Sequence, residues 1–291
     1  TDDNGKTETT YYLYSISSEK KTKLKFEGDY ATSIKKSPNF ESFLYSAVKG
    51  EGEEKTEALY LYADGENTKL GSDMNPVLVS DNAKYVYASA TQKGEGDKST
   101  TTLYYFDGAE KIKIKSDFSE IEYWSEDYSQ ILFGADGKVF FYENGEEEAV
   151  KIANGSGASI IKPAYTVDVK DLRGVPVAVY NDGAYGVYVI SDDPNEIEKI
   201  ASDVDDCQLT EDGKTLYYTK KGTLRRIEIN DSESEETLAE AESEKTTLHF
   251  YMSKDGSNIY YEDIDTLYHL DGPNEKTRIA EDVASIKMTS D

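Results

Sequence analysis

The sequence is poor in the residues on which several common kinds of protein depend. Its 291 residues include 1 Cys, 2 His and 1 Trp. A single cysteine excludes an intrachain disulfide scaffold. No stretch approaches the roughly 18 consecutive apolar residues of a membrane-spanning helix. The motifs of serine hydrolases, zinc peptidases and phosphate-binding loops are also missing, so none of these activities has a sequence signature to support it.

Positive charge is scarce as well. The chain carries 58 acidic residues against 32 lysines and arginines, which gives a net charge of −26 at pH 7. Such a chain repels phosphate backbones, so we expect no nucleic-acid partner. The same net charge makes copies of the chain repel one another, so we expect a soluble monomer. The 24 tyrosines and 9 phenylalanines are too many for a disordered chain.

What the sequence does contain is an internal repeat with a period of about 43 residues. Each copy begins with Ser or Thr, continues through Asp or Asn and a small or polar residue, and leads into an apolar–aromatic segment. Asp and Asn hydrogen-bond their own backbone in such turns and Gly supplies a positive φ, so we interpret the repeat as a hairpin turn. The copies begin at Ser37, Ser80, Ser125, Thr210 and Ser253, with a degenerate copy at Val169 and a half copy at Thr289.

Short segments rich in Tyr, Val, Ile, Leu and Thr accompany each turn and predict four strands per repeat. Seven units of about 42 residues account for the whole chain. The chain begins with the third and fourth strands of a unit, Tyr11–Ile16 and Lys23–Phe26, and ends with a first strand. We therefore predict an all-β protein: a single seven-bladed β-propeller over residues 1–291, with four-stranded antiparallel blades and a last blade closed by both termini. Six or eight blades also fit, and residues 1–10 are expected to form a linker or an exposed loop.

The turn motif also resembles that of a known family. Ser/Thr-x-Asp-Gly-Lys followed by an apolar–aromatic strand is similar to the repeat of TolB-like and tricorn-like propellers, which are WD-repeat-like. Thr210–Tyr218 and Ser253–Tyr261 match this motif most closely. The tyrosine-rich, lysine-over-arginine composition is also similar to that of propeller ectodomains of Gram-positive surface proteins. The resemblance implies a fold and hardly a function, because propellers host unrelated activities.

Candidate metal ligands are few. His249 and His269 lie in predicted strands of the sixth unit, where with an acid such as Glu262 they form a candidate transition-metal site. Partly buried strand positions are the simpler interpretation of both histidines. The acidic stretches Asp192–Glu196 and Asp203–Asp206 are candidate calcium ligands, but neither has the spacing of the twelve-residue calcium loop. We therefore expect no cofactor, with calcium as the alternative.

Aromatic residues offer a second kind of site. Tyr123 and Trp124 precede the turn at Ser125 and are a candidate stacking platform for a sugar or a peptide, although core packing is the simpler interpretation of both. Together with His249 and His269 they make up the predicted binding surface. Cys207 follows two aspartates, which raise the pKa of a thiol, so we expect inert packing there rather than a nucleophile.

These observations favour a non-enzymatic recognition or scaffold module in a bacterial surface or envelope protein. We expect an extracellular location, an anchor outside these residues and no membrane insertion by this segment. The partner would be a protein, peptide or glycan bound at one face of the ring. A carbohydrate-active hydrolase or lyase is the alternative, and it requires acidic groups that converge with His249, His269 or an arginine in one pocket. A structural spacer with a featureless polar channel is the third hypothesis.

Overall fold

The structure, a computed structural model, describes residues 9–15, 19–94, 98–162, 169–242, 246–283 and 286. Within these ranges the regular structure is β, apart from a 3-10 turn at Gly52–Glu54. The strands form seven antiparallel sheets, of which six have four strands and one has two. This confirms the all-β class and the four-stranded repeating unit, and it is the sheet pattern of a seven-bladed β-propeller.

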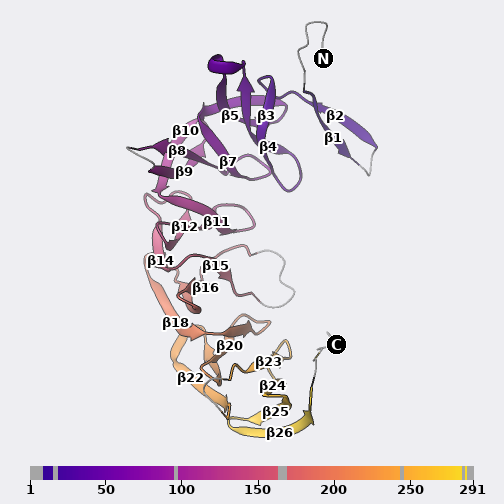
Figure 1. The fold of residues 1–291 in the computed structure, drawn as a ribbon, viewed down its shortest axis with the longest axis vertical. Helices are drawn as coiled ribbons and strands as arrows, with labels where there is room; N and C mark the ends of the chain where they lie inside the picture. Colours follow the sequence, from indigo (N-terminus) through magenta and orange to yellow (C-terminus); the bar gives the residue numbers. More distant parts are fainter. Residues whose placement is uncertain are drawn as a thin grey trace. The chain divides into compact units, whose positions relative to one another are not determined.

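The chain divides into two compact units. The first comprises Thr1–Ile121, Asp127–Ile131 and Tyr142–Ala149, and the second comprises Glu122–Glu126, Leu132–Phe141 and Val150–Asp291. In every sheet the strands that follow one another in sequence are neighbours, so each sheet is a simple meander (Figure 1). A single ring that includes both units stays a prediction.

The first unit holds the two-stranded sheet β1-β2 and the four-stranded sheets β3–β6 and β7–β10. The two-stranded sheet confirms that the chain begins with a pair of neighbouring strands, as the repeat predicts. The strands are β1 (Tyr11–Ser15), β2 (Lys20–Leu24), β3 (Tyr30–Lys36), β4 (Ser42–Lys49), β5 (Thr56–Ala63), β6 (Glu66–Ser72), β7 (Met74–Val79), β8 (Val86–Lys93), β9 (Ser99–Asp107) and β10 (Glu110–Ser116).

Four more sheets follow in the same order, and the last three belong to the second unit. Their strands are β11 (Phe118–Trp124), β12 (Gln130–Ala135), β13 (Lys138–Glu143), β14 (Val150–Asn154), β15 (Ala158–Ile160), β16 (Pro176–Asn181), β17 (Ala184–Ile190), β18 (Ile197–Val204), β19 (Asp206–Leu209), β20 (Thr215–Lys220), β21 (Thr223–Glu228), β22 (Asp231–Glu240), β23 (His249–Met252), β24 (Ile259–Asp263), β25 (Thr266–Gly272) and β26 (Glu275–Glu281). The half copy at Thr289, and with it the closure of the last blade by both termini, lies outside the described residues.

The predicted hairpin turn is confirmed at four copies of the repeat. In each copy the fourth residue has a positive φ and donates its N–H to the carbonyl of the first residue. The hydroxyl of the first residue then accepts the N–H of the residue five positions on, which fixes the start of the next strand. These hydroxyl contacts are Ser42 N to Ser37 Oγ (3.1 Å), Tyr85 N to Ser80 Oγ (3.0 Å), Thr215 N to Thr210 Oγ1 (3.1 Å) and Asn258 N to Ser253 Oγ (2.9 Å).

The core of each unit lies between successive sheets. In the first unit Leu44 and Leu59 of one sheet pack with Met74 and Val86 of the next. The aromatic residue of the apolar–aromatic segment is also buried, at five copies of the repeat. The buried residues at this repeat position are Tyr45, Tyr87, Phe133, Tyr218 and Tyr261. No helix among the described residues has the length and apolar character needed to cross a membrane.

Candidate functional site

The second unit contains a groove of about 1440 Å³. Much of its lining comes from β15, β19 and β23, the first strands of three successive sheets. Among the described residues each of these strands pairs with another strand on one side only, so each is an edge strand. The carbonyl of Phe250 in β23 accepts the side-chain amide of Gln208 in β19 at 3.0 Å, so this backbone group is already occupied. The volume exceeds the roughly 300–1,000 Å³ of a typical small-ligand pocket, which favours a segment of a polymer over a small metabolite.

Residues from both faces of these edge strands reach the groove, so its lining does not follow the alternation of a β-strand. In β19 all four residues, Asp206–Leu209, line the groove. In β23, Phe250 packs into the core whereas Tyr251 and Met252 line the groove. The remaining lining is mixed: it includes three tyrosines, several apolar residues, four carboxylates and two lysines. The tyrosines are Tyr185, Tyr251 and Tyr260, the carboxylates belong to Asp205, Asp206, Glu211 and Asp255, and the lysines are Lys162 and Lys254.

Two groove side chains have raised pKa values. Burial, with a smaller contribution from the charge of Asp206, raises the pKa of the Cys207 thiol to about 12. Burial also raises the pKa of the Tyr251 hydroxyl, with contributions from Glu262 and Asp206. The prediction for Cys207 is confirmed in direction, but burial is the larger cause and the neighbouring carboxylate the smaller one. The thiol therefore stays protonated at neutral pH and is a poor nucleophile.

Asp255 is held in the turn that borders the groove. Its Oδ1 accepts the Ser253 hydroxyl at 2.7 Å, the Ser257 N–H at 3.0 Å and the Ser257 hydroxyl at 2.8 Å. These hydrogen bonds favour the ionised form and lower the pKa of Asp255 to about 2. A general acid needs the opposite shift, because it must hold a proton at neutral pH.

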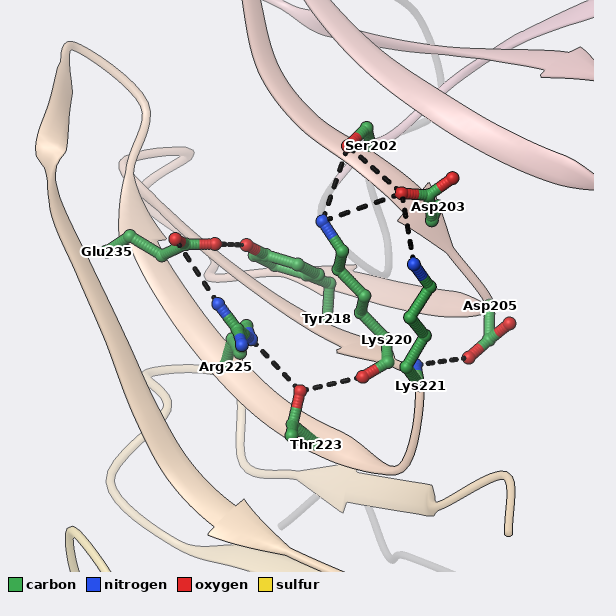
Figure 2. Close-up of polar contacts among 9 residues, drawn as sticks. All are labelled: Ser202, Asp203, Asp205, Tyr218, Lys220, Lys221, Thr223, Arg225 and Glu235. Atoms are coloured by element: carbon green, nitrogen blue, oxygen red, sulfur yellow. Dashed lines mark hydrogen bonds and ion pairs between the residues drawn. The ribbon is translucent and has the colours of Figure 1, made fainter. Parts of the chain in front are cut away.

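A network of paired charges lies next to the groove at the β20–β21 hairpin (Figure 2). Lys220 Nζ lies 3.7 Å and Lys221 Nζ 3.9 Å from Asp203 Oδ2. The Lys221 N–H donates to Asp205 Oδ2 at 3.3 Å. The aspartates that the sequence offers as calcium ligands therefore face cationic side chains and a backbone N–H in this stretch.

The other half of this network joins a buried tyrosine to an ion pair. The Tyr218 hydroxyl donates to Glu235 Oε1, and Arg225 Nη1 lies 3.3 Å from Glu235 Oε2 (Figure 2). Arg225 Nε also donates to Thr223 Oγ1 at 3.0 Å. Burial raises the pKa of Tyr218 well above its usual range, whereas the hydrogen bond from Tyr218 and the charge of Arg225 lower the pKa of Glu235. Because these charges satisfy one another, the network is a structural feature that fixes the fourth strand of its sheet.

The candidate metal sites do not assemble in the described part of the chain. His249 of β23 pairs with Glu262 of β24, whereas His269 of β25 pairs with Tyr260, so β24 lies between the two histidines. His269 Nδ1 instead lies 2.9 Å from Asp271 Oδ1. No group of three or more His, Cys, Asp or Glu residues that could hold a metal ion occurs among the described residues. Calcium binding stays an untested prediction.

The predicted binding residues lie away from the groove lining. The rings of Tyr123 and Trp124, at the end of β11, are stacked at a centroid distance of 6.3 Å. Tyr123 packs against an apolar cluster, whereas Trp124 is 40% exposed. Neither these two residues nor His249 and His269 are among the residues that line the groove.

Sequence reasoning missed the tyrosines that do line the groove. Tyr251 lies in the segment directly before the turn at Ser253, which is where the first strand of a repeat ends. Tyr185 forms a cross-strand pair with Tyr180 at a centroid distance of 5.3 Å, and both rings are exposed, by 39% and 41%. For Tyr251 the position before the turn shows that it lies on an edge strand, but for Tyr185, in the middle of its sheet on β17, no such signal exists.

No family model and no curated protein matches the chain. Among solved structures it is similar to one from a structural and mechanistic analysis of two prolyl endopeptidases, with a TM-score of 0.41 and 13% identity over 95% of this chain and 47% of that one. It is also similar to the tricorn protease, with a TM-score of 0.34 and 15% identity over 89% of this chain and 28% of that one. The chain thus spans less than half the length of either protein. The TolB-like resemblance stays a prediction, and the fold described above rests on the strand pairing.

Proposed function

We propose that the chain is a non-enzymatic recognition module that binds its partner in the groove of the second unit. The observation that carries this proposal is the lining of the groove by the edge strands of three successive sheets, with tyrosine, apolar and carboxylate side chains side by side. Paired β-sheets with short turns hold such side chains in fixed positions, which lowers the entropy lost on binding. A structural spacer would have a featureless polar channel, whereas this groove also has apolar and tyrosine side chains.

The enzyme alternative has less support at this groove. Both histidines and all four arginines of the chain are described by the structure, and none of them is among the lining residues. The cationic side chains that line the groove beside the four carboxylates are therefore two lysines. The sequence-based hypothesis of a carbohydrate-active site requires acidic groups that converge with a histidine or an arginine, and they do not do so in this groove. One of these carboxylates, Asp255, is also held ionised by its turn.

We also propose that the module acts outside the cell, in a bacterial surface or envelope protein whose anchor lies elsewhere. The support is compositional: lysine greatly outnumbers arginine, and cysteine is nearly absent. The one thiol is half-buried with a raised pKa, which protects it from oxidation in such a compartment.

Hydrogen exchange of the whole chain tests the binding site and the absence of turnover together. A synthetic peptide library and a glycan library are screened by thermal shift, and each ligand found is followed by hydrogen exchange and by mass analysis of the ligand itself. We expect a ligand that is recovered unchanged and that slows exchange in Asp206–Leu209 and His249–Met252. Consumption of the ligand, or protection confined to other strands, would overturn the proposal.

A further inference from the structure

We propose that the ligand of the groove is an extended polypeptide segment that carries lysine or arginine side chains. The inference rests on the proposed function, since it names the class of partner for the same groove. Three independent features of the lining support it: the balance of charge, the tyrosine rings and the strand edges that no further described strand pairs with.

The charge balance favours a cationic ligand. Four carboxylates line the groove against two lysines. Three of these carboxylates also accept a backbone N–H: Asp205 that of Lys221 at 3.3 Å, Asp206 that of Cys207 at 2.8 Å and Asp255 that of Ser257 at 3.0 Å. Asp206 uses Oδ1 for this bond, so its charge can still act on a ligand together with that of Glu211. The effects of Asp206 on Cys207 and Tyr251 show that its negative charge is felt across the lining. A net charge of −26 adds long-range attraction for cations and repulsion for anions.

The tyrosines supply the second feature. The face of a tyrosine ring attracts an ammonium or guanidinium group, most strongly where water is partly excluded. This chain already uses that contact on its own sheets, where Lys276 Nζ lies 4.2 Å from the ring centre of Tyr268 and Lys111 Nζ lies 4.1 Å from that of Tyr104. In the groove, Tyr185 and Tyr251 present such rings beside carboxylates. Tyrosine is also enriched among the residues that dominate binding energy at protein interfaces.

The strand edges favour a polypeptide over a glycan. An extended peptide offers alternating N–H and C=O groups that match the edge of a β-strand, and its alternate side chains can then enter pockets on one face. A neutral sugar can donate hydroxyl hydrogen bonds to the carboxylates, but it carries no positive charge to pair with them. The indole that would suit a sugar best, Trp124, lies outside the groove lining.

Fluorescence anisotropy with three labelled decapeptides tests the inference. The peptides alternate alanine with lysine, glutamine or glutamate, so their guest side chains are positive, neutral or negative on the same backbone. We expect the lysine peptide to bind at least tenfold more tightly than the glutamine peptide, and the glutamate peptide not to bind. Equal affinity for the lysine and glutamine peptides, or no affinity for the lysine peptide, would overturn the inference.

Two double variants with the same net charge distinguish the contribution of the groove carboxylates to affinity from that of the net charge of the chain. Asp206→Asn with Glu211→Gln should weaken binding of the lysine peptide about three- to tenfold, as the loss of two partly exposed ion pairs predicts. Asp192→Asn with Glu198→Gln changes the net charge equally at exposed positions outside the lining and should change affinity less than twofold. Equal weakening by both variants would show non-specific attraction and overturn the inference.

Tyr185→Ala tests the aromatic contribution, because this ring is exposed and its loss leaves the core intact. We expect at least a threefold loss of affinity for the lysine peptide with an unchanged melting temperature.

The failure of this inference is distinguishable from the failure of the proposed function. A neutral glycan or acidic peptide that protects β19 and β23 from hydrogen exchange would overturn the ligand class alone, whereas a bound ligand that leaves these strands unprotected would overturn the site itself.

Discussion

The two units fill the same repeat positions with groups of different charge. In the turns that lie wholly within one unit, the third residue is Asn39 or Asn82 in the first unit and Asp212 or Asp255 in the second, whereas the turn with Asp127 is divided between the units. The geometry is the same, since Asn82 Oδ1 accepts the Ser80 hydroxyl at 2.8 Å and Asp255 Oδ1 accepts the Ser253 hydroxyl at 2.7 Å. In these undivided turns the first unit thus uses a neutral amide where the second uses an ionised carboxylate.

The buried tyrosine of the repeat shows the same difference. In the first unit the Tyr45 hydroxyl donates to Asn67 Oδ1 at 2.8 Å, and in the second the Tyr218 hydroxyl donates to the carboxylate of Glu235. Both acceptors lie in the fourth strand of their sheet, on β6 and β22. A hydrogen bond to an ionised group is stronger than one between neutral groups, but it depends on pH.

The fourth turn residue differs in backbone strain. It is Phe40 or Ala83 in the first unit, with φ of 61° and 54°, and Gly213 or Gly256 in the second, with φ of 73° and 71°. This left-handed conformation costs conformational free energy in an L-residue with a side chain, whereas in glycine it does not. The backbone hydrogen bonds of the turn are nevertheless the same in both units. The pairing of the strands therefore sets the geometry of the turn, and the side chains adjust its stability.

The largest expected effect is that of Gly213→Val. A Cβ at Gly213 would have no heavy atom within 4 Å, so the cost is conformational and amounts to about 1–3 kcal/mol for a β-branched residue with positive φ. Urea unfolding followed by the fluorescence of Trp124, which belongs to the second unit, measures the loss. Gly213→Asn is the matched control and should cost less, because Asn tolerates this conformation. Equal stability of the Val variant and the parent would contradict the assignment of the turn.

The second-largest effect is expected for Tyr218→Phe, which compares a hydrogen bond to an ionised acceptor with one to a neutral acceptor. It removes the hydrogen bond to Glu235, and we expect a loss of about 1–2 kcal/mol, because the carboxylate keeps Arg225 and some solvent. Tyr87→Phe in the first unit removes a hydrogen bond to a neutral acceptor, the Tyr128 carbonyl at 2.8 Å, and should cost about 0.5–1.5 kcal/mol. Tyr45 is a poorer control, because its hydroxyl also accepts the Glu27 N–H at 2.9 Å. Melting temperatures of the Tyr218 and Tyr87 variants at pH 7 provide the comparison. A greater loss at Tyr87 than at Tyr218 would contradict it.

Much of the fold was predictable because its signals are local. The turn at Ser253 places a hydroxyl, a carboxylate and a glycine within four residues, and the contacts they make are with their own backbone. The groove was not predictable in this way. Tyr185 and Tyr251 belong to different sheets, and only the packing of successive sheets brings them to one surface. Trp124 was chosen for its residue type, but no local signal tells whether a side chain reaches a groove or bulk solvent.

Ala83→Gly should raise the stability of the first unit. The variant relieves the left-handed strain at φ 54°, but it also increases the entropy of the unfolded chain, so we expect a net gain of about 0.5–1 kcal/mol. Calorimetry of the whole chain, with hydrogen exchange of β8 as a local readout, measures the gain. A loss of stability would show that the alanine methyl group contributes packing that outweighs the backbone strain.

The smallest effect is a difference in pH dependence at the turns. The pKa of Asp255 is about 2 in the folded chain, below its ordinary value of 3.8, so its contribution to stability is present above pH 4 and is lost as the pH falls towards 2. Asp255→Asn should therefore flatten the fall in melting temperature between pH 4 and pH 2 and change little at pH 7. The converse variant, Asn82→Asp, should introduce such a fall in the first unit, because the Ser80 hydroxyl would then donate to a carboxylate. Identical pH profiles for both variants and the parent would show that the charge of the third turn residue does not distinguish the two units.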